Sequence, residues 1–196
     1  MLNLKLFDID LFLRTMIFEK TNIDGVFVIT PNFIGDSRGY FIERYRKELF
    51  DKEIGEVDFI QDNQSLSSRG VLRGLHYQKG DFSQAKMVWV LSGKVIDVAV
   101  DLRKESPTFG KYVMVELSDE NKKMVFIPRG FAHGFLVVSE SATFAYKVDN
   151  IYAPKEEVTI SFDDKDLNIE WPIGDMNIIM SEKDKNGIKF IDAEYF

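Results

Sequence analysis

Short apolar runs separated by turn residues recur along the chain, and they are the feature that most limits its fold. They are rich in Val, Ile, Phe and Tyr, and their boundaries carry Gly, Ser, Asn or Asp, which is typical of strands. We predict strands at 26–30, 57–61, 86–91, 94–102, 112–117, 123–127, 134–138 and 143–148. So many short strands favour a closed or sandwiched all-β fold, either a jelly roll or a barrel.

The run at 94–103 shows the clearest alternation. Ile96, Val98, Val100 and Leu102 alternate with Asp97, Ala99, Asp101 and Arg103. A period of two predicts a half-buried strand with one polar face. Ser92 and Gly93 lie between this run and the preceding one, which indicates a two-residue hairpin. Only two short helices are expected, at 45–53 and near 181–186.

Composition and charge exclude several classes of function. The chain of 196 residues has no cysteine, so it has no disulfide framework, thiolate nucleophile or Cys-ligated metal. Its formal net charge of -7 argues against general nucleic-acid binding, because that affinity depends on a basic surface. An anionic ligand would need a local basic pocket. A cytoplasmic location is the simplest expectation.

The first fifteen residues differ from the rest. They are apolar in places, but they carry Asp8 and Asp10, lack a basic start and are too short to span a bilayer. We interpret 1–15 as a leader of unclear role, either an extra strand or a partner contact, and 16–196 as one domain. No membrane association is expected.

The chain has only two histidines, and both lie between strand-like stretches. His76 titrates near neutral pH and would be mounted on rigid β structure, as a general base often is. A lone histidine is more often structural, so other residues must support a catalytic role. A metal site is disfavoured, because such a site needs several convergent ligands and His76 has no companion histidine nearby in the sequence.

Proton transfer then remains open to His76, which would require an orienting partner and an acid. Asp184, Tyr146 and Lys86 are available for these roles. Each also has a plain structural interpretation: Asp184 as a helix cap, Tyr146 as a core aromatic residue and Lys86 as a solvated charge at a strand edge.

Seven strings along the chain resemble, in order and spacing, the motifs of dTDP-4-dehydrorhamnose 3,5-epimerases. They are DSRGYF at 36–41, QDN at 61–63, RGLHYQ at 73–78, DVAVDLR at 97–103, SPTFG at 106–110, IPRGFAHGF at 127–135 and SEKD at 181–184. Each string is weak alone, but together they cover most of 16–196. The resemblance implies a cupin-type jelly roll that needs no metal or cofactor, usually a homodimer, acting on a dTDP-linked 4-keto-6-deoxy sugar.

The resemblance also implies roles for single residues. His76 would be the base that removes the proton beside the ketone, and Asp184 would orient its ring. Tyr146 would be the proton donor on the opposite face, and Lys86 would stabilise the negative charge that develops on O4. An acid and a base on opposite faces are what inversion of C3 and C5 through enolates requires.

Further residues match positions that contact substrate in this family. The resemblance places Arg38 and Arg73 as local positive charge for the diphosphate, and His133 near the sugar, although a structural hydrogen bond would also explain His133. The other implied substrate-binding residues are Glu43, Gln61, Asn63 and Lys183.

Two features depart from the family pattern, and several rival functions remain. Trp89 stands where a basic residue is more usual, which questions the shape of the pocket, and the leader at 1–15 is unexpected. The rivals are an epimerase that inverts only C3 or only C5, a ketoisomerase on a related sugar nucleotide, and a non-catalytic sugar-nucleotide-binding module. A purely structural jelly roll without a small-molecule site is the remaining alternative.

Overall fold

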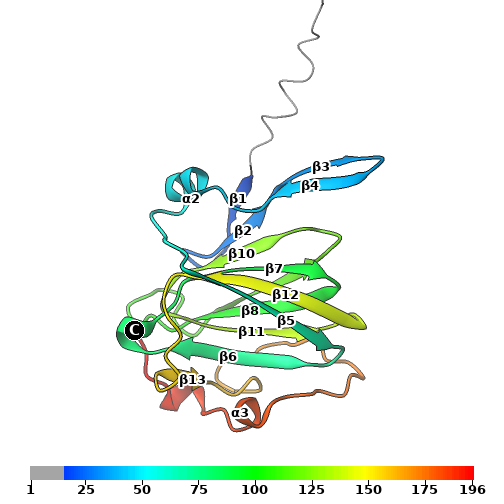
Figure 1. Ribbon diagram of the computed structural model, residues 1–196. Helices are drawn as coiled ribbons and strands as arrows, with labels where there is room; N and C mark the ends of the chain where they lie inside the picture. The colour runs from blue at the N-terminus through cyan, green and yellow to red at the C-terminus, as the bar shows by residue number, and fades with distance from the viewer. Residues whose placement is uncertain (1–15) are drawn as a thin grey trace, which may run out of the picture.

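Two antiparallel sheets packed face to face form the body of the molecule (Figure 1). The computed structural model describes residues 16–196. One sheet has six strands in the order β1-β2-β10-β7-β12-β5, and the other has five in the order β13-β6-β11-β8-β9. The chain passes repeatedly from one sheet to the other, as in a jelly roll, so the predicted all-β architecture is confirmed.

The remaining elements are few. β3 and β4 form a separate hairpin that projects from the body (Figure 1). The strands are β1 Ile17–Lys20, β2 Phe27–Thr30, β3 Asn32–Asp36, β4 Gly39–Glu43, β5 Gln61–Ser68, β6 Leu72–Gln78, β7 Lys86–Ser92, β8 Lys94–Asp101, β9 Tyr112–Ser118, β10 Met124–Ile127, β11 Phe131–Val137, β12 Ser141–Val148 and β13 Glu157–Thr159. The helices are α2 Lys47–Glu53 and α3 Glu182–Lys185, with 3-10 turns η1 Gly80–Phe82 and η2 Phe190–Asp192.

Three apolar clusters hold these layers together. The first lies between the sheets and includes Val88 and Phe144 from one sheet and Phe135 from the other. The second lies outside the five-stranded sheet, where residues of the C-terminal segment such as Trp171 cover it. The third lies outside the six-stranded sheet, around Phe50 of α2. Each sheet is therefore covered on at least part of both faces.

The predicted half-buried strand is wrong in one respect, because both faces of β8 are buried. Its aliphatic face packs under the C-terminal segment. The polar face is closed as well: Asp97 and Asp101 are 2% and 0% exposed. A buried carboxylate must be paired to be tolerated. Both aspartates are hydrogen-bonded to other side chains, and an alternation pattern in the sequence cannot predict those contacts.

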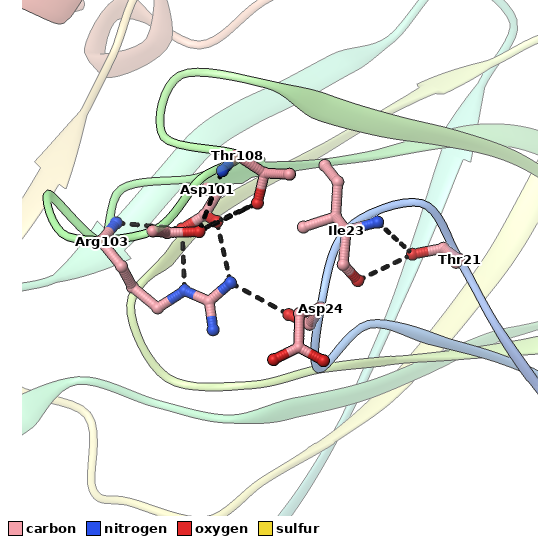
Figure 2. A network of polar contacts seen from close by, with 7 residues as sticks. Thr21, Ile23, Asp24, Asp101, Arg103 and Thr108 are labelled. Atoms are coloured by element: carbon pink, nitrogen blue, oxygen red, sulfur yellow. Dashed lines mark hydrogen bonds and ion pairs between the residues drawn. The ribbon is translucent and has the colours of Figure 1, made fainter.

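Asp101 illustrates such a pairing (Figure 2). Its carboxylate accepts hydrogen bonds from the Arg103 guanidinium at 2.8 Å, the Ser106 hydroxyl at 2.6 Å and the Thr108 hydroxyl at 2.7 Å. Burial raises the pKa of Asp101, but these donors outweigh burial and lower it to about 2. Arg103 also donates to the backbone carbonyl of Asp24 at 3.0 Å (Figure 2), which joins the end of β8 to the turn before β2.

The predicted hairpin at Ser92 and Gly93 is wrong. β7 and β8 belong to different sheets and do not pair with each other. Gly93 has φ +79°, and a Cβ there would lie 2.0 Å from the carbonyl oxygen of Ser141. Glycine at this position therefore allows the chain to turn tightly from one sheet to the other.

The predicted strand at 57–61 is also wrong. Residues 57–60 have no regular structure, and Val57 and Phe59 are apolar because they pack on the cluster around Phe50. The strand begins at Gln61 instead, where β5 forms an edge of the six-stranded sheet. Strands β1, β3, β4, β5, β6 and β13 were not among those predicted, mainly because they are short or polar.

The two expected helices are confirmed with shorter bounds. α2 covers most of 45–53, and α3 lies within 181–186. Ser181 caps α3, because its side chain accepts a hydrogen bond from the backbone N–H of Asp184 at 3.2 Å. The predicted leader at 1–15 lies outside the described residues.

Candidate active site

A cavity of about 420 Å³ opens between the two sheets. Its walls come from both of them: β6 and β11 on one side, and β5, β7 and β12 on the other. The lining residues are Gln61, Asn63, Gln64, Ser65, Arg73, His76, Gln84, Lys86, His133, Phe135, Phe144, Tyr146, Val148, Tyr152, Glu157 and Lys183. Eight of the eleven predicted site residues are in this set, and a ninth, Asp184, lies behind His76.

His76 is presented by β6, and the local sequence explains how. The residue two positions earlier, Gly74, has φ +127°, and a Cβ on it would lie 2.5 Å from the Cα of Gly134. Glycines on both strands therefore allow a close approach of β6 and β11. That approach sets the register in which His76 lies opposite His133.

The imidazole Nε2 of His76 is hydrogen-bonded to Oδ1 of Asp184. Asp184 is 4% exposed, and its other oxygen accepts a 2.7 Å hydrogen bond from the Ser181 hydroxyl. The carboxylate is therefore held from two sides. A carboxylate against one ring nitrogen fixes the tautomer and stabilises the imidazolium once a proton is taken.

The protonation states of this pair suit a base. Burial lowers the pKa of His76 below its ordinary range, opposed by Asp184 and assisted by the charges of Lys183 and Lys86. Burial raises the pKa of Asp184, but hydrogen bonds from His76 and Ser181 outweigh it, so the net shift is downward. At neutral pH the ring is neutral beside an ionised carboxylate.

Lys86 and Tyr146 face the same cavity from the six-stranded sheet. Lys86 on β7 donates to the backbone carbonyl of His76 at 3.5 Å. Burial lowers its pKa to about 8, so it is still mainly an ammonium at neutral pH. Burial, and then the charge of Glu157, raise the pKa of Tyr146, which keeps the phenol protonated. A cation and a proton donor therefore lie across the cavity from the base.

A second histidine–carboxylate pair lines the cavity beside the first. Nε2 of His133 lies 2.8 Å from Oδ2 of Asp97, and both side chains are almost fully buried. His133 thus has both features considered from sequence, because it faces the cavity and has a structural hydrogen bond. Asp97 was not predicted as a site residue; its place among alternating aliphatic residues was the available signal.

The other cavity residues form a polar lobe on β5 and β6. The side-chain amide of Gln61 donates to Asn63 at 2.8 Å, and the Arg73 guanidinium donates to the Ser67 hydroxyl at 3.0 and 3.1 Å. No carboxylate among residues 16–196 lies within ion-pair distance of the Arg73 guanidinium. Its charge is therefore available to an anionic ligand.

Two predicted substrate-binding residues do not line this cavity. Arg38 lies at the tip of the β3–β4 hairpin, where it pairs with Asp36 and its side chain is 88% exposed. Glu43 ends β4 and pairs with Arg46 at 2.6 Å. Within one chain, Arg38 and Glu43 therefore lie apart from the predicted site residues that line the cavity.

Trp89, which raised doubt about the pocket, does not face it. It lies on β7 and packs on the cluster outside the six-stranded sheet. The guanidinium carbon of Arg44 lies 5.8 Å from its ring centroid. Trp89 therefore belongs to the outer face of the sheet. The residues of β7 whose side chains point to the opposite face contribute to the cavity wall.

In the described part of the chain, no group of three or more His, Cys, Asp or Glu is placed to hold a metal ion. None of the helices described is long and apolar enough to cross a membrane. Besides Asp97, sequence reasoning missed Glu157 and Tyr152, which have no distinctive motif around them.

Comparison with known proteins gives a consistent picture. The family model for dTDP-4-dehydrorhamnose 3,5-epimerase matches residues 20–192. The Shigella flexneri protein of that name is 51% identical over 90% of this chain and 97% of its own length. The crystal structure of the Elizabethkingia anophelis enzyme has a TM-score of 0.88 and 50% identity, covering 93% of this chain and all of that one. A Legionella pneumophila epimerase solved with dTDP-4-keto-L-rhamnose has a TM-score of 0.88 and 45% identity, covering 91% and 95%.

Proposed function

The chain belongs to the dTDP-4-dehydrorhamnose 3,5-epimerase family, and we propose that it uses His76 to invert C3 and C5 of dTDP-4-dehydro-6-deoxy-D-glucose. The product is dTDP-4-dehydro-L-rhamnose, in the biosynthesis of dTDP-rhamnose. The observation that carries this proposal is the placement of a base and an acid on the two different sheets that enclose one cavity.

The chemistry follows from that placement. A C–H bond beside a ketone is acidic because the electron pair it leaves can delocalise onto the carbonyl oxygen as an enolate. His76 takes the proton from one face of the sugar and becomes imidazolium, stabilised by Asp184. Tyr146 then donates a proton to the same carbon from the opposite face, which inverts it. Before the second carbon reacts, His76 must release the proton it took to solvent and Tyr146 must regain one from solvent. The same steps at the second carbon then complete the reaction.

Lys86 serves the intermediate in this proposal. Its ammonium would lie against O4, where negative charge develops, in a site screened from water. A preorganised donor of this kind is commonly worth about a hundredfold or more in rate. A pKa of about 8 leaves the group charged at neutral pH.

The polar lobe, together with Lys183 of α3, is proposed to bind the nucleotide. Arg73 and Lys183 supply positive charge for the diphosphate, and Gln61 and Asn63 supply hydrogen bonds. His133 is proposed to contact the sugar. We treat 16–196 as one catalytic domain, and a cytoplasmic location stays a prediction.

We further propose that the enzyme is a homodimer whose hairpins are exchanged. Arg38 and Glu43 match nucleotide contacts by motif, yet neither lines the cavity of its own chain. The hairpin that carries them projects from the body (Figure 1) and exposes Phe33, Tyr40 and Phe41 by 46%, 54% and 67%. Insertion into the cavity of a second copy would bury these rings and complete the site.

Deuterium exchange tests the reaction. In deuterated buffer, the native protein should introduce deuterium at both C3 and C5 of dTDP-4-keto-6-deoxyglucose, as followed by NMR, and His76→Asn should abolish this. A circular dichroism melt of the variant checks that it is folded. Exchange at one carbon would indicate a single-centre epimerase. No exchange despite demonstrated dTDP binding would overturn the epimerase proposal.

Mixing two inactive variants tests the dimer. If Arg38 serves the partner's cavity, a mixed dimer of His76→Asn and Arg38→Ala chains has one intact site, and activity should return on mixing. If Arg38 served its own chain, or the protein were a monomer, mixing would restore nothing.

A further inference from the structure

Glu157 occupies a special place in the cavity. It begins β13, which pairs with β6 so that Glu157 lies opposite Gln78 and Thr159 lies opposite His76. Among the described residues that line the cavity, it carries the only carboxylate. Its side chain is only 15% exposed. A half-buried acid in a cavity for an anionic ligand needs an explanation, because it would repel the ligand if it were unpaired.

Its two oxygens hold two separate segments. One oxygen lies 2.9 Å from Nζ of Lys183 on α3, and the other accepts a 2.9 Å hydrogen bond from the hydroxyl of Tyr152. Lys183 directly precedes Asp184, the partner of His76. Glu157 therefore anchors the helix that delivers Asp184.

The second segment is itself fixed. Gln78, which is buried on β6, donates to the carbonyl of Ile151 at 3.0 Å and accepts from the backbone N–H of Ala153 at 2.7 Å. Tyr152 stands between these two contacts. Its ring is thus presented at the cavity by a pinned loop, and Glu157 sets the position of its hydroxyl.

We propose that Glu157 is a positioning residue for the epimerisation, acting by clamping Lys183 and Tyr152 and by giving the cavity wall its one fixed negative charge. This inference rests on the proposed function and adds to it a residue that does not itself exchange protons with the sugar.

The surrounding charges support this role. Burial lowers the pKa of Lys86, and the charge of Glu157 opposes that shift; burial raises the pKa of Tyr146, and Glu157 adds to it. Burial raises the pKa of Glu157 itself, but bonds from Lys183 and Tyr152 and the charge of His76 lower it overall. The groups that interact with it are Lys183 on α3, Tyr152 on the loop, His76 on β6, Lys86 on β7 and Tyr146 on β12.

The pH dependence of kcat/KM is the readout that a merely structural role would not move. Removing the anion of Glu157 disfavours the charged forms of His76 and Lys86, and it makes the tyrosinate of Tyr146 easier to form. The pKa values of His76, Lys86 and Tyr146 should therefore all fall. In Glu157→Gln, both limbs of the pH profile should shift to lower pH, and kcat should drop about tenfold to a hundredfold.

Two variants make the test specific. Glu156→Gln is the matched control, because Glu156 pairs with Lys79 and does not line the cavity. Its profile should match the native one. Glu157→Asp keeps the charge on a shorter side chain, so its limbs should stay near the native pH while kcat falls.

The outcomes separate the two proposals. An inactive native enzyme would overturn the epimerase function itself. An active native enzyme with an unshifted profile in a folded Glu157→Gln variant would overturn the role of Glu157 alone, as would a change in KM with kcat unaltered. Equal profile shifts in the Glu156→Gln control would also contradict it.

Discussion

The two histidine–carboxylate pairs differ in where their carboxylates come from. His133 and Asp97 lie on adjacent strands of one sheet, β11 and β8. His76 lies on β6, but its partner Asp184 comes from α3, far along the chain. The His76 side chain is 23% exposed and that of His133 only 8%. One pair is part of the sheet, and the other is assembled from two layers.

This difference indicates which pair can do chemistry. A base must reach the substrate, tolerate a change of charge and recover, whereas a change of charge on a fully buried histidine–carboxylate pair is costly. Asp184 keeps a hydroxyl donor and a helix start beside it, which can stabilise its charge while His76 cycles. This difference supports the proposal that His76 transfers the proton and that His133 positions the sugar.

The largest expected effect comes from exchanging the two carboxylates for amides. Asp184→Asn should lower kcat by about 10³-fold, because an amide leaves the base in the wrong tautomer and unstabilised. Asp97→Asn should change kcat by less than about tenfold and instead lower the unfolding free energy by about 1–3 kcal/mol, since the buried ring nitrogen of His133 keeps only a weaker partner. Steady-state kinetics and chemical denaturation measure both.

Equal losses of kcat in the two variants would break the distinction between the pairs. A stability loss confined to Asp184→Asn would reverse it.

The pH profile should show which histidine is the base. The base must be neutral, and burial holds the pKa of His76 below its ordinary range, so the acid limb of kcat/KM should lie below about pH 6.5. The basic limb should lie near pH 8, where Lys86 loses its charge. Lys86→Met should lower kcat about a hundredfold and move the basic limb up toward the raised pKa of Tyr146.

His133→Asn should keep the acid limb in place, because His133 is not assigned the titrating role. Loss of the acid limb in His133→Asn would indicate that His133, and not His76, is the base. A basic limb that stays near pH 8 in Lys86→Met would show that another group sets it.

A smaller effect should follow from the cap of α3. Ser181→Ala removes the hydroxyl that binds both the backbone and the carboxylate of Asp184, so α3 should lose about 1 kcal/mol and kcat should fall less than about tenfold. Ser181→Thr keeps a hydroxyl and should behave nearly as the native protein. If alanine and threonine gave the same rate, support of Asp184 by the cap would be excluded.

Local patterns predicted much of the scaffold. The apolar runs at β2, β7, β8, β9, β10, β11 and β12 were assigned within a few residues, because a buried strand needs such side chains whatever its neighbours are. The polar strand β5 was not predicted, because an edge strand beside a cavity does not need apolar side chains. The corner at Gly93 was misinterpreted because glycine serves a hairpin and a sheet-to-sheet passage equally well.

The same division holds for the site. The ordered motifs were enough to identify the family and to nominate His76, Asp184, Tyr146 and Lys86. They could not show that Trp89 faces away, that Asp97 is the partner of His133, or that Glu157 clamps Lys183. Each of these depends on which face of a strand meets which neighbour.

The sequence by itself therefore determined the residue types, their order and the periodicity of the strands, because these are local properties of the chain. Only the tertiary structure decided which groups meet. His76 and Asp184 are brought together when α3 folds back onto β6, and Arg38 is carried away from the cavity by its hairpin. Contacts between distant segments depend on how the layers pack, and packing is set by the whole chain at once.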